Sequence, residues 1–363
     1  MNFEEPIQLK SARAWRTYLG GKLIDELHGV KNAKDTNFPE EWLISTVTAR
    51  NTGRENLEEG LSYTTLGPSL KSLIEEFPQQ LLGSAHLQRF GKSTGVLVKL
   101  LDSAERLTVQ VHPTRQMAKT LFQSNYGKTE CWHILACRNN LPEKPCIYLG
   151  FKPGVTRQAW YNCFVQQNIP EMLSMLHRFE VQPGETYLIK GGVPHAIGAG
   201  CFLTEIQEPT DYTIRTEKTT PSGLAVSDNM CHQGLGFEKM FDCFCYNGLT
   251  AEQTLESYRI KPVETRPGEK EVIGYQNTNM FRLKVIEVAK EYVAGKTGVF
   301  SGIYFLNGKG TLNGKPVFQG DQFFVPALCS DFCLKNSGDQ PMRVLQFFGP
   351  NAMAAAAGLV LKK

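Results

Sequence analysis

The chain has 363 residues, of which 41% are hydrophobic and 21% charged, and its formal net charge is +3 at pH 7. This composition is that of a globular protein with room for more than one hydrophobic core, and it excludes a disordered chain. The small positive charge gives no basis for a nucleic-acid partner, because proteins that bind nucleic acids usually carry a clustered basic surface.

Hydropathy and cysteine placement indicate the compartment. The first ten residues, MNFEEPIQLK, lack the apolar stretch of a secretory signal, and no run of about 18 apolar residues could span a membrane. The 10 cysteines are scattered without a CxxC pair, so we expect reduced, buried thiols. We therefore expect a cytoplasmic monomer or homodimer without membrane or nucleic-acid partners.

Local patterns in the first hundred residues predict mixed structure. Residues 46–50 form a β-rich stretch that ends in a turn at 51–53. A helix is predicted over 69–77, where apolar residues recur at helical spacing and Ser69 can cap the first turn. Residues 95–101 are a short apolar run of strand length.

Between residues 105 and 215, short strands alternate with turns and two helices. The predicted strands are 107–111, 130–136, 147–151 and 186–189. The predicted helices are 114–122, with Thr114 as a cap, and 169–177. Short strands separated by Gly and Pro turns are typical of a β-barrel or sandwich.

The composition changes after residue 215. Residues 219–223 (TTPSG) resemble a linker, and 251–258 has a helical pattern. A strand pattern returns between about 263 and 350. We therefore expect three parts: residues 1–215, a helical and lid-like segment at 216–262, and a C-terminal β domain at 263–363.

Polar residues at strand spacing form the most informative pattern. Gln110 and His112 are two residues apart and so face the same side of a strand, and Lys128 and Glu130 share a face of the next strand. His195 follows a strand between two Gly-containing turns, which is a recurrent way to direct an imidazole into a small barrel. Alone, such a histidine is more often a hydrogen-bonded core residue.

Two imidazoles, one carboxylate and one amide oxygen suit zinc or a similar divalent ion, and they leave a position for water or substrate. In the alternative interpretation, Gln110 and His112 are hydrogen-bonded core residues and Lys128 and Glu130 are an ordinary ion pair. That alternative requires several costly polar groups along apolar strands. We therefore favour a metal site.

Four segments resemble the signature blocks of the type I mannose-6-phosphate isomerases, also called phosphomannose isomerases. The segments are 109–113 (VQVHP), 127–132 (GKTECW), 194–198 (PHAIG) and 205–211 (EIQEPTD). The resemblance runs from about residue 15 to 215 and more faintly to the C-terminus, and it is specific only when the four blocks are taken together. It implies a mainly β fold of two cupin (jelly-roll) barrels with a smaller helical segment. It also implies one Zn²⁺ per chain, bound by Gln110, His112, Glu130 and His195.

The resemblance further implies that Lys128 and Arg215 line a sugar-phosphate site and take part in catalysis. Asp211 is similar to an active-site carboxylate of the family, and Thr108 resembles a position that contacts phosphate. Glu205 and Gln207, which alternate on one strand, are weaker candidates for supporting the metal or the sugar. Each of these residues also has an ordinary structural interpretation. A lone arginine is usually a surface ion-pair partner, Asp211 could shape a turn, and Thr108 could be an ordinary strand residue.

A degenerate repeat supports the second barrel. Residues 320–326 repeat the Gly-turn and strand pattern of the block that ends at His195. Leu328-Cys329-Ser330 stands where a metal ligand would be expected. We therefore expect the C-terminal domain to be a second cupin barrel without metal, and residues 1–215 to be the catalytic cupin domain.

The implied reaction is the interconversion of mannose 6-phosphate and fructose 6-phosphate through a cis-enediolate, whose charge requires a preorganised electrophile. The base is not assigned: Lys128, Glu205 and a metal-bound hydroxide are alternatives. The family usually has an acidic pair after His-Pro, whereas Thr114-Arg115 follows here. The other hypotheses are a cupin metalloenzyme for another sugar phosphate or for oxygen chemistry with iron, and a non-catalytic sugar-binding bicupin.

Overall fold

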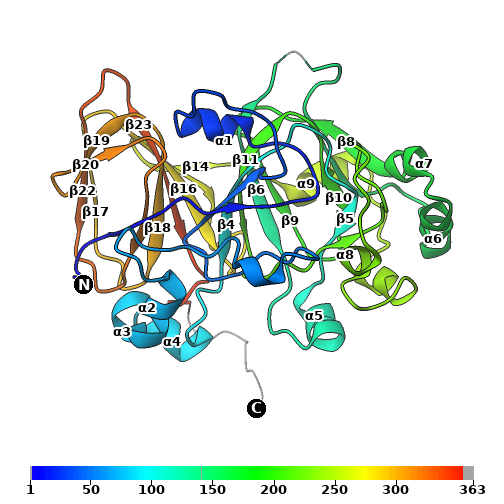
Figure 1. Cartoon of the computed structure of the whole chain (residues 1–363), viewed down its shortest axis with the longest axis horizontal. Helices are drawn as coiled ribbons and strands as arrows, with labels where there is room; N and C mark the ends of the chain where they lie inside the picture. Colours follow the sequence, from blue (N-terminus) through cyan, green and yellow to red (C-terminus); the bar gives the residue numbers. More distant parts are fainter. Residues whose placement is uncertain (1, 140, 355–363) are drawn as a thin grey trace. The chain divides into compact units, whose positions relative to one another are not determined.

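The computed structural model describes residues 2–139 and 141–354, and it is mainly β, as predicted from the sequence (Figure 1). The chain divides into two compact units. The larger unit consists of Ser11–Ser62 and Leu97–Val263, and the smaller unit of Met1–Lys10, Tyr63–Val96 and Glu264–Lys363. Each unit is built on two antiparallel sheets and has its own apolar core.

The larger unit has one sheet of seven strands and one of five. The order in the first is β13 (Arg259–Ile260), β9 (Thr186–Ile189), β6 (Glu130–Cys137), β11 (Cys201–Gln207), β4 (Leu97–Asp102), β3 (Glu40–Leu43) and β2 (Arg13–Ala14). The order in the second is β12 (Ile214–Arg215), β5 (Gln110–Val111), β10 (His195–Ile197), β7 (Cys146–Phe151) and β8 (Leu176–Glu180). Trp132 and Ile134 of β6 pack in one core with Ile147 and Leu149 of β7, so the two sheets pack face to face.

Short helices connect these strands. They are α1 (Lys22–Leu27), α5 (Arg115–Phe122), α6 (Arg157–Gln166), α7 (Ile169–Ser174), α8 (Asp228–His232), α9 (Ala251–Tyr258) and the 3₁₀ turns Glu55–Leu57 and Lys239–Cys243. The predicted cap of α5 is confirmed, because the Thr114 side chain accepts a hydrogen bond from the Met117 N–H. Helix α9 matches its predicted bounds.

The smaller unit also has two sheets. The order in the first is β1 (Ile7–Leu9), β21 (Gln322–Val325), β18 (Ser301–Asn307), β23 (Met342–Phe348), β16 (Arg282–Val288), β15 (Glu269–Ile273) and β14 (Val263–Arg266). The order in the second is β17 (Glu291–Ala294), β22 (Phe332–Asn336), β19 (Lys309–Leu312) and β20 (Lys315–Phe318). Three helices complete the unit: α2 (Leu70–Glu76), α3 (Pro78–Leu82) and α4 (Ser84–Phe90). Ser69 caps α2 as predicted.

Three predicted elements differ from the structure. The β-rich stretch at 46–50 is not a strand; β3 lies earlier, because Ile44 has a φ of 42° and the Ser45 hydroxyl bonds to the backbone of Val47. The helix predicted over 169–177 ends at Ser174, since the chain then pairs with β7 as strand β8. The strand predicted over 107–111 pairs only at Gln110–Val111, and the Val109 N–H donates to the Glu217 carboxylate at 2.6 Å instead.

The compact units group the chain differently from the three predicted parts. Residues 1–10 and 63–96 belong with the C-terminal strands, where Ile7 of β1 pairs with Phe324 of β21. Residues 216–262, predicted as a lid, contribute Met240, Phe241, Cys243 and Phe244 to an apolar core of the larger unit. A lid in this segment stays a prediction, and residues 355–363 of the predicted third part lie outside the described residues.

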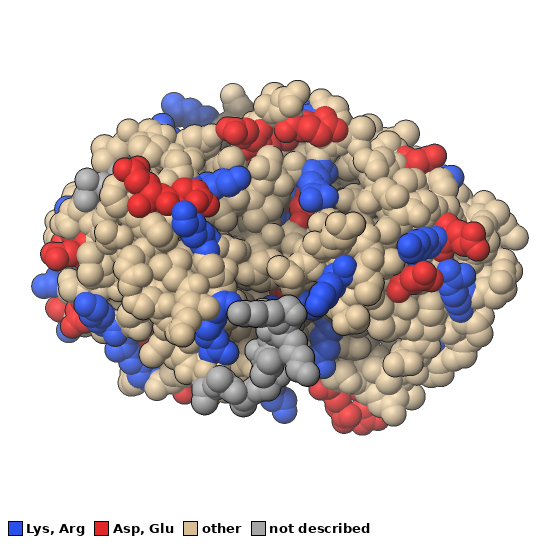
Figure 2. All heavy atoms as spheres, turned by 90° about the horizontal axis from the view of Figure 1, so that it is seen from below, with Lys and Arg blue, Asp and Glu red and all other residues tan. Residues whose placement is uncertain are grey.

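Neither hydropathy nor charge singles out a surface. Within the described ranges, no helix has the length and apolar character needed to cross a membrane. On the face shown in Figure 2, Lys and Arg side chains are interspersed with Asp and Glu side chains.

Candidate metal and anion site

Strand register brings the predicted ligands together in the larger unit. Gln110 of β5 pairs with His195 of β10 on one side and with Arg215 of β12 on the other. Glu130, the first residue of β6, pairs with Gln207, the last residue of β11. Paired residues of neighbouring strands lie about 5 Å apart, so residues from distant parts of the chain converge at one place.

Three of these side chains form a buried cluster with the donor set of a metal site. The candidate ligand atoms of His112, Glu130 and His195 all lie within 4.8 Å of one another. His112 Nε2 lies 3.1 Å from one carboxylate oxygen of Glu130, His195 Nε2 lies 3.4 Å from the other, and the two Nε2 atoms are 3.2 Å apart. All three side chains are at most 1% exposed.

Backbone carbonyls orient both histidine rings. His112 Nδ1 lies 2.8 Å from the Tyr212 carbonyl, and His195 Nδ1 lies 2.8 Å from the Val193 carbonyl. A carbonyl only accepts, so each Nδ1 donates and each neutral ring presents its Nε2 lone pair to the cluster. Burial, aided by the charge of Lys128, lowers the pKa of His112 to about 4, and burial also lowers the pKa of His195. Both rings are therefore neutral at pH 7, as metal ligation requires.

Glu130 supplies the negative charge of the cluster. Burial would raise the pKa of Glu130, but Lys128 and then His112 hold it well below its usual range. Its Oε1 atom is buried and has no hydrogen-bond partner. A buried, ionised oxygen without a donor is costly unless a cation meets it. The donor set and this orphaned oxygen both fit a divalent metal ion.

Gln110 and Lys128 complete the surroundings of the cluster. The amide Nε2 of Gln110 lies 3.3 Å from His195 Nε2, and a half-turn of the amide would place its oxygen there instead. Lys128 Nζ lies 2.7 Å from His112 Nε2 and donates to Glu130 Oε2 at 2.6 Å. The ammonium of Lys128 and a metal ion would thus compete for the same two atoms.

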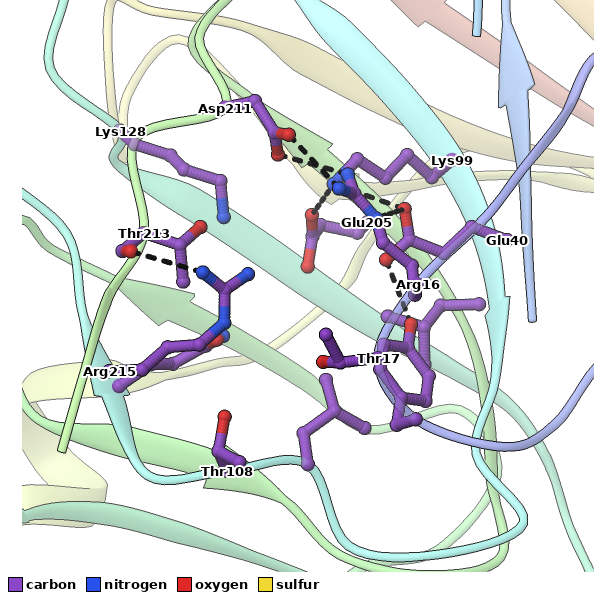
Figure 3. Close-up of a pocket in the computed structure, with 14 residues that line it drawn as sticks. Arg16, Thr17, Glu40, Lys99, Thr108, Lys128, Glu205, Asp211, Thr213 and Arg215 are labelled. Atoms are coloured by element: carbon purple, nitrogen blue, oxygen red, sulfur yellow. Dashed lines mark hydrogen bonds and ion pairs between the residues drawn. The ribbon is translucent and has the colours of Figure 1, made fainter. Parts of the chain in front are cut away.

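A pocket with an empty volume of about 430 Å³, part of it open to solvent, adjoins the cluster (Figure 3). Four cationic side chains line it: Arg16, Lys99, Lys128 and Arg215. Its lining also includes the carboxylates Glu40, Glu205 and Asp211, together with Thr108 and Gln110. Such a concentration of charge in a buried space indicates a site for a polar, charged ligand.

Most of these charges are paired. Arg16 binds both oxygens of Asp211 at 2.9 and 3.0 Å and donates to Glu40 at 3.0 Å, while Lys99 lies 3.1 Å from Glu205. Burial would raise the pKa values of Glu40 and Asp211, but Arg16 and then Lys99 lower them, that of Glu40 to about 2 and that of Asp211 below its usual range. These carboxylates are therefore ionised at neutral pH.

Arg215 is the exception. Its side chain points into the pocket (Figure 3), and its guanidinium donates only to the backbone carbonyls of Met230 at 2.8 Å and Thr213 at 3.3 Å. In the described part of the chain no carboxylate forms an ion pair with it, and burial lowers its pKa. A buried guanidinium that no carboxylate contacts is suited to an anionic ligand.

Comparisons with known proteins agree with this geometry. No protein-family model matches the chain. The chain is 26% identical over 286 residues to YvyI of Bacillus subtilis, covering 77% of this chain and 83% of that one. It is 31% identical over 147 residues to the mannose-6-phosphate isomerase ManA of the same organism, covering 39% of this chain and 44% of ManA. The crystal structure of the mannose 6-phosphate isomerase from Bacillus subtilis superposes with a TM-score of 0.72 over 94% of this chain and 99% of that one, at 22% identity.

The chain is thus similar in sequence to mannose-6-phosphate isomerases and shares the fold of a solved one. The structure places the residues nominated by the family resemblance around this one site, except Gln207, whose amide donates to the backbone carbonyls of Glu208 and Thr210. Gln110, Thr108, Lys128, Glu205, Asp211 and Arg215 line the pocket, and His112, Glu130 and His195 form the adjoining cluster.

Sequence reasoning missed Arg16, Glu40 and Lys99. Lys99 carried a usable signal, because a single lysine inside the apolar run 96–101 needs a buried counter-charge once the strand is covered on both faces. Arg16 and Glu40 carried none, since Arg16 reaches Asp211 across 195 positions of sequence. The family resemblance did not point to these three residues either, because they lie outside the four resembling segments.

Proposed function

We propose that the chain is a zinc-dependent aldose–ketose isomerase that interconverts mannose 6-phosphate and fructose 6-phosphate through a cis-enediolate. One observation carries the proposal: the buried His112, Glu130 and His195 cluster adjoins the same pocket as the uncompensated guanidinium of Arg215. The cluster suits a divalent ion and the guanidinium suits a phosphate. The ManA relative and the superposed structure bear the name of this activity.

Charge balance supports a phosphate monoester as the ligand. Four cationic side chains line the pocket, and its three carboxylates with Glu130 supply four negative charges. The fixed formal charges therefore cancel, and a divalent ion would leave the site with two positive charges in excess. A phosphate monoester carries close to two negative charges at neutral pH.

We propose His112, Glu130, His195 and the amide oxygen of Gln110 as the residues that hold one zinc ion. The chemistry that such an ion supplies is Lewis-acid polarisation of a carbonyl oxygen. Oriented rings, neutral imidazoles and the orphaned Glu130 oxygen support this ligand set. A bound ion would displace the Lys128 ammonium from His112 and Glu130.

The chain's own groups then have distinct tasks in the proposed reaction. Arg215 and Thr108 hold the phosphate or the developing negative charge, and guanidinium suits this because it does not give up its proton. Proton transfer between the two carbons falls to Lys128, acting as the neutral amine after its ammonium has given up a proton to solvent, or to Glu205. Lys128 is the simpler choice, because Glu205 accepts from Trp132 Nε1 at 3.1 Å and lies 3.1 Å from Lys99.

We also propose that the two units are cupin barrels and that the smaller one holds no metal. Each unit pairs two antiparallel sheets around a core, and the chain shares its fold with the superposed isomerase. The core of the smaller unit is filled by apolar side chains such as Phe305, Phe323 and Phe332. At the position that corresponds to His195 the sequence has Leu328-Cys329-Ser330.

A different sugar phosphate is the second candidate, because Arg115 stands where the family usually has an acidic residue. In the structure Arg115 donates to Glu208 at 2.5 Å, and the other Glu208 oxygen accepts from the Thr129 N–H. Arg115 does not line the pocket. Arg115 is thus held in an ion pair outside the pocket and leaves the pocket lining unchanged, which favours mannose 6-phosphate as the substrate.

A coupled assay of fructose 6-phosphate formation from mannose 6-phosphate tests the proposal. Parallel assays with glucose 6-phosphate and ribose 5-phosphate identify a different substrate. We expect kcat/KM for mannose 6-phosphate to exceed the others by at least about 100-fold. A protein that holds one zinc ion but turns over only another sugar phosphate would contradict the assigned substrate.

A further inference from the structure

One loop contacts both the proposed metal-binding cluster (His112, Glu130 and His195) and Arg215, the proposed anion-binding residue. Residues 208–213 join β11 to β12 in the larger unit. The Tyr212 carbonyl of this loop accepts from His112 Nδ1 at 2.8 Å and so orients a proposed metal ligand. Arg215 follows the loop and bonds back to the Thr213 carbonyl. Any displacement of this loop therefore reaches both the metal-binding cluster and Arg215.

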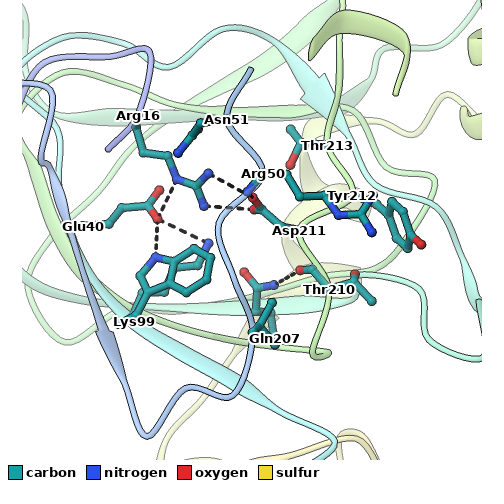
Figure 4. Close-up of polar contacts among 12 residues, drawn as sticks. Arg16, Glu40, Arg50, Asn51, Lys99, Gln207, Thr210, Asp211, Tyr212 and Thr213 are labelled. Carbon is teal, nitrogen blue, oxygen red and sulfur yellow. Dashed lines mark hydrogen bonds and ion pairs between the residues drawn. The ribbon is translucent and has the colours of Figure 1, made fainter. Parts of the chain in front are cut away.

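The loop is held at its centre by Asp211 (Figure 4). Its carboxylate accepts two hydrogen bonds from Arg16 and one from the Arg50 N–H at 2.9 Å. The bidentate contact with Arg16 is the strong geometry for a guanidinium and a carboxylate. With its oxygens engaged in this way, Asp211 is better suited to hold the loop than to move a proton.

Arg16 is itself firmly fixed. Its Nε donates to Glu40 at 3.0 Å, and its guanidinium lies over the Trp42 ring, 5.1 Å from the centroid. Its side chain is 5% exposed, as are those of Asp211 and Glu40. Arg16 thus ties the loop to strand β3, an element that contributes no proposed metal ligand.

We propose that Arg16 is a positioning residue for this site. Through Asp211 it fixes the loop whose Tyr212 carbonyl orients His112 and whose end carries Arg215. Its effect on turnover rests on the proposed function, whereas its effect on metal affinity does not. Arg16 lines the pocket, but its hydrogen bonds run to Asp211 and Glu40 and not to a proposed metal ligand.

Replacement of Arg16 has a defined consequence. Arg16→Met would leave the buried Asp211 carboxylate with the Arg50 N–H as its remaining hydrogen-bond donor, and we expect the loop to shift so that this carboxylate regains water. His112 then loses its fixed orientation. Loss of an outer partner of a metal-binding histidine lowers metal affinity by about 10- to 100-fold. We expect a loss of zinc affinity in this range and a raised KM for the sugar phosphate.

The experiment is a zinc competition titration against a chromogenic chelator, with thermal unfolding measured on the same samples. Arg138→Met is the control, because Arg138 also forms an ion pair with a buried carboxylate of the larger unit, Asp102, at 2.6 Å, and does not line the pocket. We expect Arg138→Met to lower Tm but to bind zinc like the wild type. Arg16→Met should lower both Tm and zinc affinity.

Equal zinc affinity in the wild type and Arg16→Met would overturn the proposal and leave Arg16 a purely structural residue. If Arg16→Met does not fold, Arg16→Lys replaces it. A lysine makes one bond to Asp211 where arginine makes two, so we expect an intermediate zinc affinity, and wild-type affinity would again overturn the proposal. A wild type that binds zinc but isomerises no sugar phosphate would refute the proposed function and leave the zinc comparison valid.

Discussion

Lys128 is held by the two side chains that a metal ion also needs. Its ammonium contacts His112 at 2.7 Å and Glu130 at 2.6 Å, which are two of the three residues in the buried cluster. Lysine here has two consequences for function. Without a metal ion, the ammonium offsets the negative charge of Glu130. With a metal ion on these two residues, Lys128 would supply a mobile cation next to the proposed substrate.

We predict that Lys128→Met binds zinc at least as tightly as the wild type. The change removes a positive charge and a competitor for two ligand atoms. We also predict that kcat falls by at least about 100-fold, because a general acid–base group contributes on that order. Chelator competition and single-turnover assays measure the two effects separately. Weaker zinc binding together with near-normal kcat would remove Lys128 from both roles.

Arg215 leads to the opposite expectation from Arg16, although both are buried arginines. Arg215 has no carboxylate partner in the described residues, so its burial costs free energy that no ion pair offsets. We predict that Arg215→Met has an unfolding free energy equal to or above that of the wild type. KM for the sugar phosphate should rise by about 30-fold or more, corresponding to about 2 kcal/mol of lost charge contact. Urea unfolding and steady-state kinetics test this, and a large loss of stability would refute the anion-binding role.

At the scale of elements, strand register and one loop assemble the site. Motif spacing correctly predicted which residues share a face, because the alternation of a strand is a local property that sequence displays. Gln110 with His112 and Lys128 with Glu130 are examples. The pairing of Gln110 with both His195 and Arg215 is a non-local property, and only the family resemblance, not the spacing, anticipated it.

The ion pairs around the loop predict a pH dependence of stability. Arg16 and Lys99 overcome the effect of burial and lower the pKa of Glu40 to about 2, whereas an unfolded chain would titrate near 4.5. Below pH 4.5 the Glu40 carboxylate of the unfolded chain therefore binds a proton, whereas that of the folded chain stays ionised down to about pH 2. We predict that the unfolding free energy falls between pH 4.5 and 2, by at most about 1.4 kcal/mol per pH unit for this group.

Asp211 acts in the same direction over a window that begins near pH 3.8, because Arg16 also lowers its pKa. Urea unfolding of metal-free protein at several pH values measures the slope. Glu40→Gln removes one titrating carboxyl and should give a shallower slope. An identical slope in this variant and the wild type would contradict the assigned ion pairs.

At the scale of the whole molecule, the predicted mainly β class is confirmed, and the predicted division into three parts differs from the two compact units. Strand patterns are local, so β9 was predicted with its observed bounds. The pairing of β1 with β21 joins residues more than 300 positions apart and leaves no local pattern. For the same reason, the cluster of His112, Glu130 and His195 could be predicted from the sequence. The ion pairs of Arg16, Glu40 and Lys99 could not.

The most direct test of the account is a zinc titration of the metal-free protein, followed by isomerase activity on mannose 6-phosphate and by bound zinc. The account predicts no activity after chelation, a linear rise as zinc is restored, and a break at one zinc ion per chain. Full activity in the metal-free protein, or a break at one zinc without any turnover of mannose 6-phosphate, would contradict it.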